Sequence, residues 1–329
     1  MLINKEQFDH CRWIIATCES ENEQLRGHEF YQFAQDNSLV NLHQRYNGQT
    51  FGLRAYNDKN ILNWLDSLQP NFFHISQNQQ DFDISLLPNI GIHWNEYKCE
   101  PMASTSHTVL EFMNKHQDRK TVFFKGDFWM FEHLIKHKIE HIDQIDDKSA
   151  LVMSCPFFEY FEKHKHMDEI MMRCEQLGVP VMLDLIWLPL CKQKPILKYT
   201  DCVEVVTHSF TKLIPLAGIK CGIAFWKSPV ESHKITYPLG NRFGAWLVSN
   251  FLEKFGYDHA LRYNDLQIKW CNRLGLLPTN MVLTSIVPND HFLTPYDLHK
   301  NRLQTSTKLF SLVGFYECDE YLEKYLQDV

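Results

Sequence analysis

No apolar stretch in these 329 residues approaches the length needed to span a membrane, and no block of lysine and arginine stands out. The formal net charge is −7 with histidine neutral, which argues against a nucleic-acid partner. The first residues, MLINKEQFDHCRW, carry charges and no long apolar run, so they predict neither a secretory signal nor a transit peptide. We therefore expect a cytoplasmic protein with no membrane or nucleic-acid partner.

Several familiar active-site signatures are missing as well. The ten cysteines are scattered and form no C-x-x-C pair, which favours reduced thiols over a disulfide framework. No G-x-S-x-G elbow and no Walker loop occurs. Gly48 and Gly52 do not stand between a strand and a helix with a following acid, so they do not predict a dinucleotide site.

The chain instead has the composition of a folded enzyme-sized protein. Apolar residues make up 44% of it, charged residues 22% and aromatic residues 13%. Short β-rich runs occupy residues 120–124, 150–154, 179–184, 203–207 and 221–226. A helix is predicted from about residue 162 to 177, because apolar residues recur there at helical spacing and Gly178 follows as a C-cap.

Apolar strands separated by amphipathic helices predict a sheet that is buried on both faces. We therefore predict an α/β fold with three layers, α/β/α, around a mostly parallel sheet. Residues 56–235 would form this large domain, and residues 1–55 and 236–329 would pack together as a smaller one. Ligands of such sheets bind at the carboxyl ends of the strands, so the residues that follow the strands are the functional candidates.

Lys212 follows one of these strands, in a segment with hydroxyl groups at Thr207, Ser209 and Thr211. A lysine among hydroxyl and apolar side chains can be desolvated, which lowers the pKa of its amine. Such an amine can form a Schiff base with an aldehyde. Taken alone, the segment fits an ordinary surface lysine in a turn better.

Two further segments carry polar groups in suitable places. Asp184 ends the apolar run VPVMLD, where a ligand-contacting carboxylate belongs, although a helix N-cap or loop aspartate is the common alternative. Ser104, Thr105 and Ser106 precede an amphipathic helix. That position predicts an N-cap and also an anion site, because helix N-terminal amides favour phosphate.

In their order and spacing these segments resemble the fold-type I pyridoxal 5′-phosphate (PLP) enzymes, and among them the class I/II aminotransferases. The family's lysine motif is typically S-[FY]-[ST]-K, followed by an apolar stretch ending in G-[LI]-R-x-G, and this chain has SFTK at 209–212 and LAGIKCG at 216–222. The family's aspartate follows an apolar strand as D-E-A-Y, and this chain has VMLDLIW at 181–187. The resemblance spans roughly residues 101–226.

The resemblance implies PLP as cofactor and a role for each matching residue. Lys212 would form the internal aldimine and later shuttle protons at the substrate α-carbon. Asp184 would pair with the pyridinium nitrogen and keep it protonated. Ser209, with Thr211 helping, would bind the cofactor phosphate.

The resemblance extends to the walls of the site. Ser104, Thr105 and Ser106 would form the phosphate cup, and Phe128, or else Trp129, would stack on the pyridine ring. Core packing is the alternative for both aromatics. Family members have active sites at a subunit interface, which implies a homodimer.

The chain departs from the family at several of these positions. Lys220 stands where the family has a phosphate-binding arginine, and supplies charge without the bidentate fork. The asparagine of the family's N-P-x-N-P-T-G loop is missing, since this chain reads PFFEY at 156–160. Trp187 replaces the tyrosine beside the cofactor's 3-oxygen, and an indole N–H can donate but cannot accept.

The residues that would bind the substrate carboxylate match the family less well. The family's carboxylate-binding arginine lies near the C-terminus, where this chain offers Lys308, with Arg302 and Arg242 as other candidates. The leading hypothesis is an aminotransferase-like enzyme that takes an amino donor and a keto-acid acceptor. The alternatives are a PLP-dependent decarboxylase or lyase, and a degenerate, non-catalytic scaffold. Lys212 and Asp184 argue against the scaffold, which needs neither.

His133, His137 and His141 fall at i, i+4 and i+8 in a segment that can be helical. Spaced histidines can bind zinc or nickel. No cysteine or carboxylate set completes such a site, so a solvated helix face is the preferred interpretation and no metal is predicted.

Overall fold

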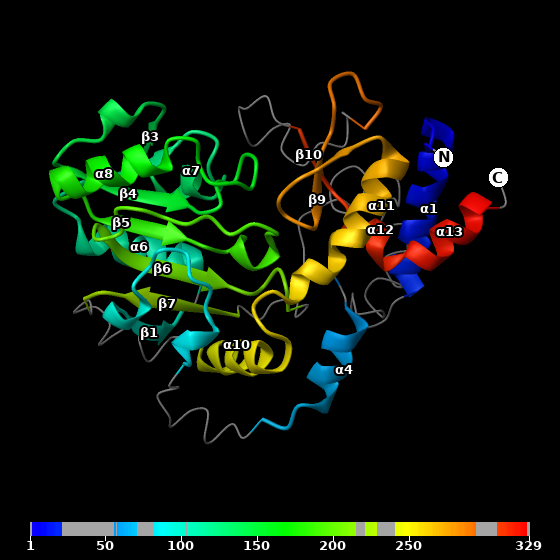
Figure 1. Ribbon diagram of the computed structural model, residues 1–329, viewed down its shortest axis with the longest axis horizontal. Helices are drawn as coiled ribbons and strands as arrows, with labels where there is room; N and C mark the ends of the chain where they lie inside the picture. The colour runs from blue at the N-terminus through cyan, green and yellow to red at the C-terminus, as the bar shows by residue number, and fades with distance from the viewer. Residues whose placement is uncertain are drawn as a thin grey trace, which may run out of the picture.

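The computed structural model describes residues 2–21, 56, 58–70, 82–102, 104–214, 221–228, 241–293 and 308–327. Its centre is a seven-stranded sheet with the order β1-β7-β6-β5-β4-β2-β3 (Figure 1). The strands are β1 (Lys98–Pro101), β2 (Lys120–Phe124), β3 (His137–Ile139), β4 (Ser149–Ser154), β5 (Val181–Asp184), β6 (Val203–Ser209) and β7 (Gly222–Trp226). Strands β2 to β6 pair in parallel, whereas β7 and β1 are antiparallel to their neighbours.

Both faces of this sheet are covered, which confirms the predicted three-layer α/β/α fold. On one face, α6 (Thr105–Lys115) and α7 (Phe131–Leu134) pack against side chains that include Val152, Met182 and Val205. On the other face, α8 (Met167–Leu177) and α10 (Arg242–Phe255) join the large core cluster. Successive strand residues point to opposite faces, so strands that are buried on both must be apolar throughout.

Helix α8 begins at Met167, five residues after the predicted start. Phe161 has a φ of +56° and Phe157 forms a β-bridge with Glu162, so the preceding segment cannot continue a helix. The predicted end is confirmed. Gly178 has a φ of +63° and its N–H donates to the carbonyls of the last turn.

The histidine segment is not one helix, which corrects the expectation of a solvated helix face. α7 ends at Leu134, and His137 already pairs with Val122 in the parallel β2–β3 ladder. His133 and His137 therefore lie on different elements. Among the described residues, no group of three or more His, Cys, Asp or Glu side chains is placed to hold a metal ion.

A second assembly lies beside the large sheet (Figure 1). It contains α1 (Lys5–Glu21), α11 (Asn264–Leu274), α12 (Val313–Glu317), α13 (Asp319–Gln327) and a small sheet of β8 (Leu277–Pro278), β9 (Thr284–Ile286) and β10 (Leu309–Ser311). The N-terminal helix α1 packs against α12 and α13. The predicted domain boundaries at residues 55 and 235 stay a prediction.

Short elements complete the described chain. Helix α4 (Lys59–Ser67) is an α-helix, and the 3-10 turns are η2 (Ile84–Leu86), η3 (Trp94–Glu96), η4 (Ile142–Gln144), η5 (Leu188–Leu190) and η7 (His259–Tyr263). Buried Asp58 caps α4 and accepts hydrogen bonds from Tyr263 (2.6 Å) and His259 (3.3 Å). Burial alone would raise the pKa of Asp58, but these hydrogen bonds hold it below its usual range. None of the helices in the described ranges has the length and apolar character needed to cross a bilayer.

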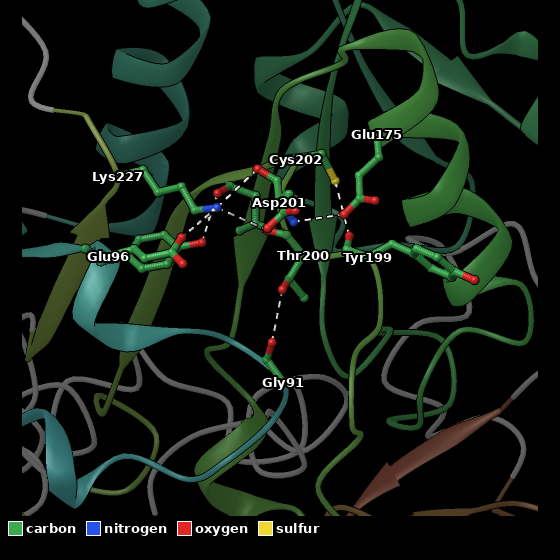
Figure 2. A network of polar contacts seen from close by, with 10 residues as sticks. Gly91, Glu96, Glu175, Tyr199, Thr200, Asp201, Cys202 and Lys227 are labelled. Atoms are coloured by element: carbon green, nitrogen blue, oxygen red, sulfur yellow. Dashed lines mark hydrogen bonds and ion pairs between the residues drawn. The ribbon is translucent and has the colours of Figure 1, made fainter.

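A polar network fixes the amino-terminal edge of the large sheet (Figure 2). The Lys227 ammonium pairs with Glu96 (3.2 Å) and donates to the carbonyl oxygen of Asp201 (3.1 Å). The Asp201 amide donates to Glu175 at the end of α8 (2.9 Å), and the Thr200 hydroxyl donates to the carbonyl of Gly91 (3.0 Å). The turn that leads into β6 is therefore held from three sides.

Gly91 should tolerate no side chain. Its φ is +86°, and a Cβ would lie 2.2 Å from the backbone oxygen of Leu197. We expect Gly91→Ala to lower the free energy of unfolding by roughly 3 kcal/mol, from left-handed strain and overpacking together. Gly178→Ala is the matched control, because its φ is also positive but nothing lies within 4 Å of the added Cβ.

Urea unfolding of both variants measures the difference. Gly178→Ala should lose only about 1–2 kcal/mol, the cost of the left-handed conformation alone. Equal losses in the two variants would show that the contact with Leu197 does not constrain the turn.

Candidate active site

Four parallel strands bring polar residues to one edge of the large sheet. Asp127 follows β2, Cys155 follows β4, Asp184 ends β5, and Lys212 follows β6. The carboxyl ends of parallel strands meet at the same edge, which is where open α/β sheets bind ligands. The sequence predicted Asp184 and Lys212 at strand ends, and the structure places both there.

Asp184 is fully buried, and only one of its carboxylate oxygens is satisfied. Oδ1 accepts hydrogen bonds from the Thr207 hydroxyl (2.9 Å) and the Ile186 amide (3.1 Å). Oδ2 has no hydrogen-bond partner among the described residues. Burial raises the pKa of Asp184 to about 7, against the lowering effect of these hydrogen bonds. A buried carboxyl oxygen without a partner is costly, so this group is suited to meet a donor from a ligand.

Lys212 lies in a turn directly after β6. The amides of Leu213 and Ile214 both donate to the carbonyl of Phe210, which closes the turn. Lys212 is half-buried, and its ammonium lies 5.6 Å from the centroid of the Trp187 ring. Trp187 follows Asp184 by three residues, so the aromatic side chain beside the lysine comes from the segment that directly follows β5.

The hydroxyl residues around the turn face each other. Ser209 Oγ and Thr211 Oγ1 are 3.0 Å apart, and Ser209 Oγ also donates to the carbonyl of Cys221 (3.4 Å). Thr207 and Ser209 point to the same face of β6, because side chains alternate along a strand. That face is the one covered by α6, since Val205 belongs to the same core cluster as Val109 and Phe112 of α6.

Helix α6 presents its amino end to this edge. Its last turn lies at the opposite edge, because His116 contacts Glu204 at the start of β6 (2.7 Å). Ser104 is the N-cap and accepts the His107 amide (3.1 Å), as predicted. Thr105 is buried, and its hydroxyl has no hydrogen-bond partner in the described chain. Ser106 follows in the first turn, so the first amides of this 11-residue helix, which have no intrahelical partner, lie at the edge where the strands end.

The two aromatic candidates have different surroundings. Phe128 packs edge-on against Phe158 (5.3 Å between centroids) and Trp187 (6.3 Å). Trp129 packs against His133 of α7 (5.5 Å). Of the two candidates, Phe128 is therefore the one that contacts the Trp187 ring, against which Lys212 also lies. The indole Nε1 of Trp187 is buried and has no hydrogen-bond partner among the residues described.

The charged candidates for the substrate side are spread over the chain. Arg242 is the first residue of α10, which packs against β1 and β7, and Lys308 directly precedes β10 in the small sheet. Lys220 and Arg302 lie outside the described residues. Their roles in binding phosphate or carboxylate stay predictions.

Sequence reasoning missed one residue at this edge. Asp127 is buried, and its carboxylate accepts the amides of Phe128 (2.6 Å) and Ser154 (2.9 Å). Burial raises the pKa of Asp127 to about 6. The signal was available, since Asp127 follows the apolar run KTVFF much as Asp184 ends VPVMLD.

Comparisons with known proteins define the fold. No family model matches the sequence, and no curated protein matches it significantly. The histidinol-phosphate aminotransferase from Clostridium acetobutylicum aligns with a TM-score of 0.54 and 13% identity over 83% of this chain and 96% of its own. BacF from Bacillus subtilis aligns with a TM-score of 0.54 and 12% identity over 99% and 98% of the two chains.

A further similar structure is an aspartate aminotransferase mutant from Thermus thermophilus in complex with tryptophan. It has a TM-score of 0.53 and 10% identity, and the alignment covers 86% of this chain and 91% of that one. These likenesses show that the chain has the fold of the fold-type I aminotransferases. The resemblance stated from the sequence is thus confirmed at the level of the fold.

The pH dependence of stability tests the burial of Asp184. Its pKa rises from about 3.9 in an unfolded chain to about 7 in the folded protein, so the folded state binds the proton more tightly. Proton binding by Asp184 therefore stabilises the folded protein fully below pH ~4, and this contribution is lost as the pH rises through 7. Asp184→Asn removes this loss and keeps the shape of the side chain.

We expect the unfolding free energy of the wild type, relative to Asp184→Asn, to fall by on the order of 1.4 kcal/mol per pH unit between pH 4 and 7 and to level off above pH 7. Ligand-free protein and urea titrations at each pH give the difference. Taking a difference removes the contribution of buried His208, whose lowered pKa acts in the opposite direction. If the unfolding free energies of the wild type and Asp184→Asn changed with pH in parallel, the raised pKa of Asp184 in the folded protein would be wrong.

Proposed function

We propose that this chain is an aminotransferase-like enzyme that binds PLP at the carboxyl edge of the sheet and holds it covalently on the Lys212 amine. One observation carries the proposal. Four buried polar atoms at this edge have no partner among the described residues, namely Asp184 Oδ2, Trp187 Nε1, Thr105 Oγ1 and Ser154 Oγ. A flat ligand with a ring N–H, a ring oxygen and a phosphate offers a partner to each of the first three.

Asp184 has the properties required opposite a pyridine nitrogen. Its free oxygen can accept an N–H bond, while Thr207 and Ile186 hold the other oxygen and fix the plane of the carboxylate. An anionic carboxylate beside the ring favours the protonated nitrogen. When bound, PLP supplies an electron sink next to the amino group of a substrate, and a protonated ring nitrogen strengthens it.

The phosphate of the cofactor suits the amino end of α6. Amides without intrahelical partners, the helix dipole and the Thr105 hydroxyl all favour an anion there. Ser104 and Ser106 flank this position, and Ser209 and Thr211 reach the same edge from the turn after β6. Lys220 would add the positive charge that the family draws from arginine.

Phe128 and Trp187 would lie against the cofactor ring and enclose it. Phe128 contributes a face or an edge, and Trp187 contributes a buried N–H that suits the 3-oxygen of the ring. Lys212 lies against the Trp187 ring, which limits the access of water to its amine. Released by an incoming amino donor, that amine would move protons at the substrate α-carbon.

The remaining parts of the proposal rest on the family resemblance. The substrates would be an amino donor and a keto-acid acceptor, with Arg242, Lys308 or Arg302 binding a carboxylate. The enzyme would work as a homodimer. The fold shared with known aminotransferases supports these parts.

Covalent trapping tests the assignment of Lys212. Wild-type protein incubated with PLP and reduced with borohydride should carry the pyridoxyl group on the peptide that contains Lys212. We expect Lys212→Ala to lose this label, because Lys212 is the lysine whose amine lies beside the Trp187 ring, whereas Lys220 is proposed to meet the phosphate. Lys198→Ala, which removes an exposed lysine, should label as the wild type does. A label that persists in Lys212→Ala would refute the assignment, and it is read by peptide mass mapping.

Binding of pyridoxine 5′-phosphate tests Trp187, because this compound lacks the aldehyde and does not depend on Lys212 for attachment. Trp187→Phe removes the indole N–H and keeps an aromatic ring. We expect affinity to fall about fivefold, as for the loss of one hydrogen bond worth about 1 kcal/mol. Trp129→Phe serves as control and should bind normally. An unchanged dissociation constant in Trp187→Phe, measured by calorimetry, would rule out the proposed contact.

A further inference from the structure

The site contains a second buried carboxylate, Asp127, beside the one proposed to meet the cofactor ring. Ser154 joins the two groups. Its amide donates to Asp127 Oδ2 (2.9 Å), and Ser154 is the register partner of Asp184 across β4 and β5. The next amide along, that of Cys155, donates to the carbonyl oxygen of Asp184 (2.9 Å). Adjacent residues of one strand end therefore hold both aspartates.

The two carboxylates share an environment with little compensating charge. Both side chains are at most 1% exposed, and each raises the cost of ionising the other because like charges repel at low dielectric. The charge of Asp127 contributes to the raised pKa of Asp184. Two interacting acids of this kind lose their protons in two steps that belong to the pair.

The ionisable neighbours do not neutralise the pair. Cys155 and Tyr160 lie near it, and burial raises the pKa of each, so both stay uncharged near neutral pH. The charged groups on and beside the covering helices mostly pair with residues other than the two aspartates. His107 contacts Glu111 on α6, Glu132 of α7 pairs with Lys138, and Lys163 pairs with Asp168. His133 packs on Trp129. Among the described residues, Lys212 brings a cation to this edge, on the Trp187 face.

We propose that Asp127 and Asp184 together hold one proton in the ligand-free protein, and that Asp184 gives this proton to the ring nitrogen of a bound pyridine. The O–H bond of Asp184 breaks, an N–H bond forms, and Asp184 remains as the carboxylate that accepts it. Asp127 acts as a positioning residue, because its charge makes the nitrogen a stronger base without touching it. The inference rests on the proposed function for the identity of the ligand.

The ligand-free protein tests the shared proton directly. Carbon-13 NMR of aspartate carboxyl groups should show one carboxyl that stays protonated above pH 6 in the wild type. In Asp127→Asn the titration of Asp184 should move down by about one pH unit, a tenfold change in its proton dissociation constant. Aspartates that all titrate below pH 5 would overturn the proposal, whatever the protein binds.

The bound ligand gives the second readout. Pyridoxine 5′-phosphate labelled with ¹⁵N in the ring reports whether its nitrogen is protonated. The pH at which the nitrogen loses its proton should fall by about one unit in Asp127→Asn, and should stay unchanged in Asp143→Asn, which removes an exposed charge. An equal midpoint in folded Asp127→Asn would refute the role of Asp127. Wild-type protein that does not bind the compound would refute the proposed function instead, and the carboxyl titration would still decide the shared proton.

Discussion

The buried carboxylate of Asp184 is the constraint around which the site is arranged. Burying an aspartate costs free energy unless its oxygens are satisfied, and here one oxygen has two donors and the other has none in the described chain. β5 is apolar up to this residue, so the fold places a polar end on a fully buried strand. A ligand donor at Oδ2 would supply the hydrogen bond that this oxygen lacks among the described residues.

The two edges of the sheet have opposite characters. At the amino edge, the Thr200 hydroxyl, the Asp201 amide and the Lys227 ammonium each donate to a partner in one network (Figure 2). At the carboxyl edge, Asp184 Oδ2, Trp187 Nε1, Thr105 Oγ1 and Ser154 Oγ are buried without a hydrogen-bond partner among the described residues. Local rules of polar satisfaction are broken mainly at functional sites, which favours the carboxyl edge as the functional one.

Sequence patterns predicted the elements that depend on local chemistry. The strand runs, the Gly178 cap, the Ser104 N-cap and the strand-end positions of Asp184 and Lys212 follow from apolar runs and capping residues. Features that depend on which segments pair in the folded protein could not be predicted from such local patterns. Within the histidine segment, His137–Ile139 form a strand because they pair with the edge of β2, and α8 starts late because Phe157 bridges Glu162. The pairing of Asp127 with Asp184 through Ser154 requires knowing which strands are neighbours.

A crystal structure of the protein grown with pyridoxine 5′-phosphate would show whether this edge of the sheet binds a pyridine cofactor in one orientation. The proposed site predicts the ring nitrogen within hydrogen-bond distance of Asp184 Oδ2 and the phosphate at the amino end of α6. A ligand bound elsewhere, or one whose ring nitrogen points away from Asp184, would contradict it.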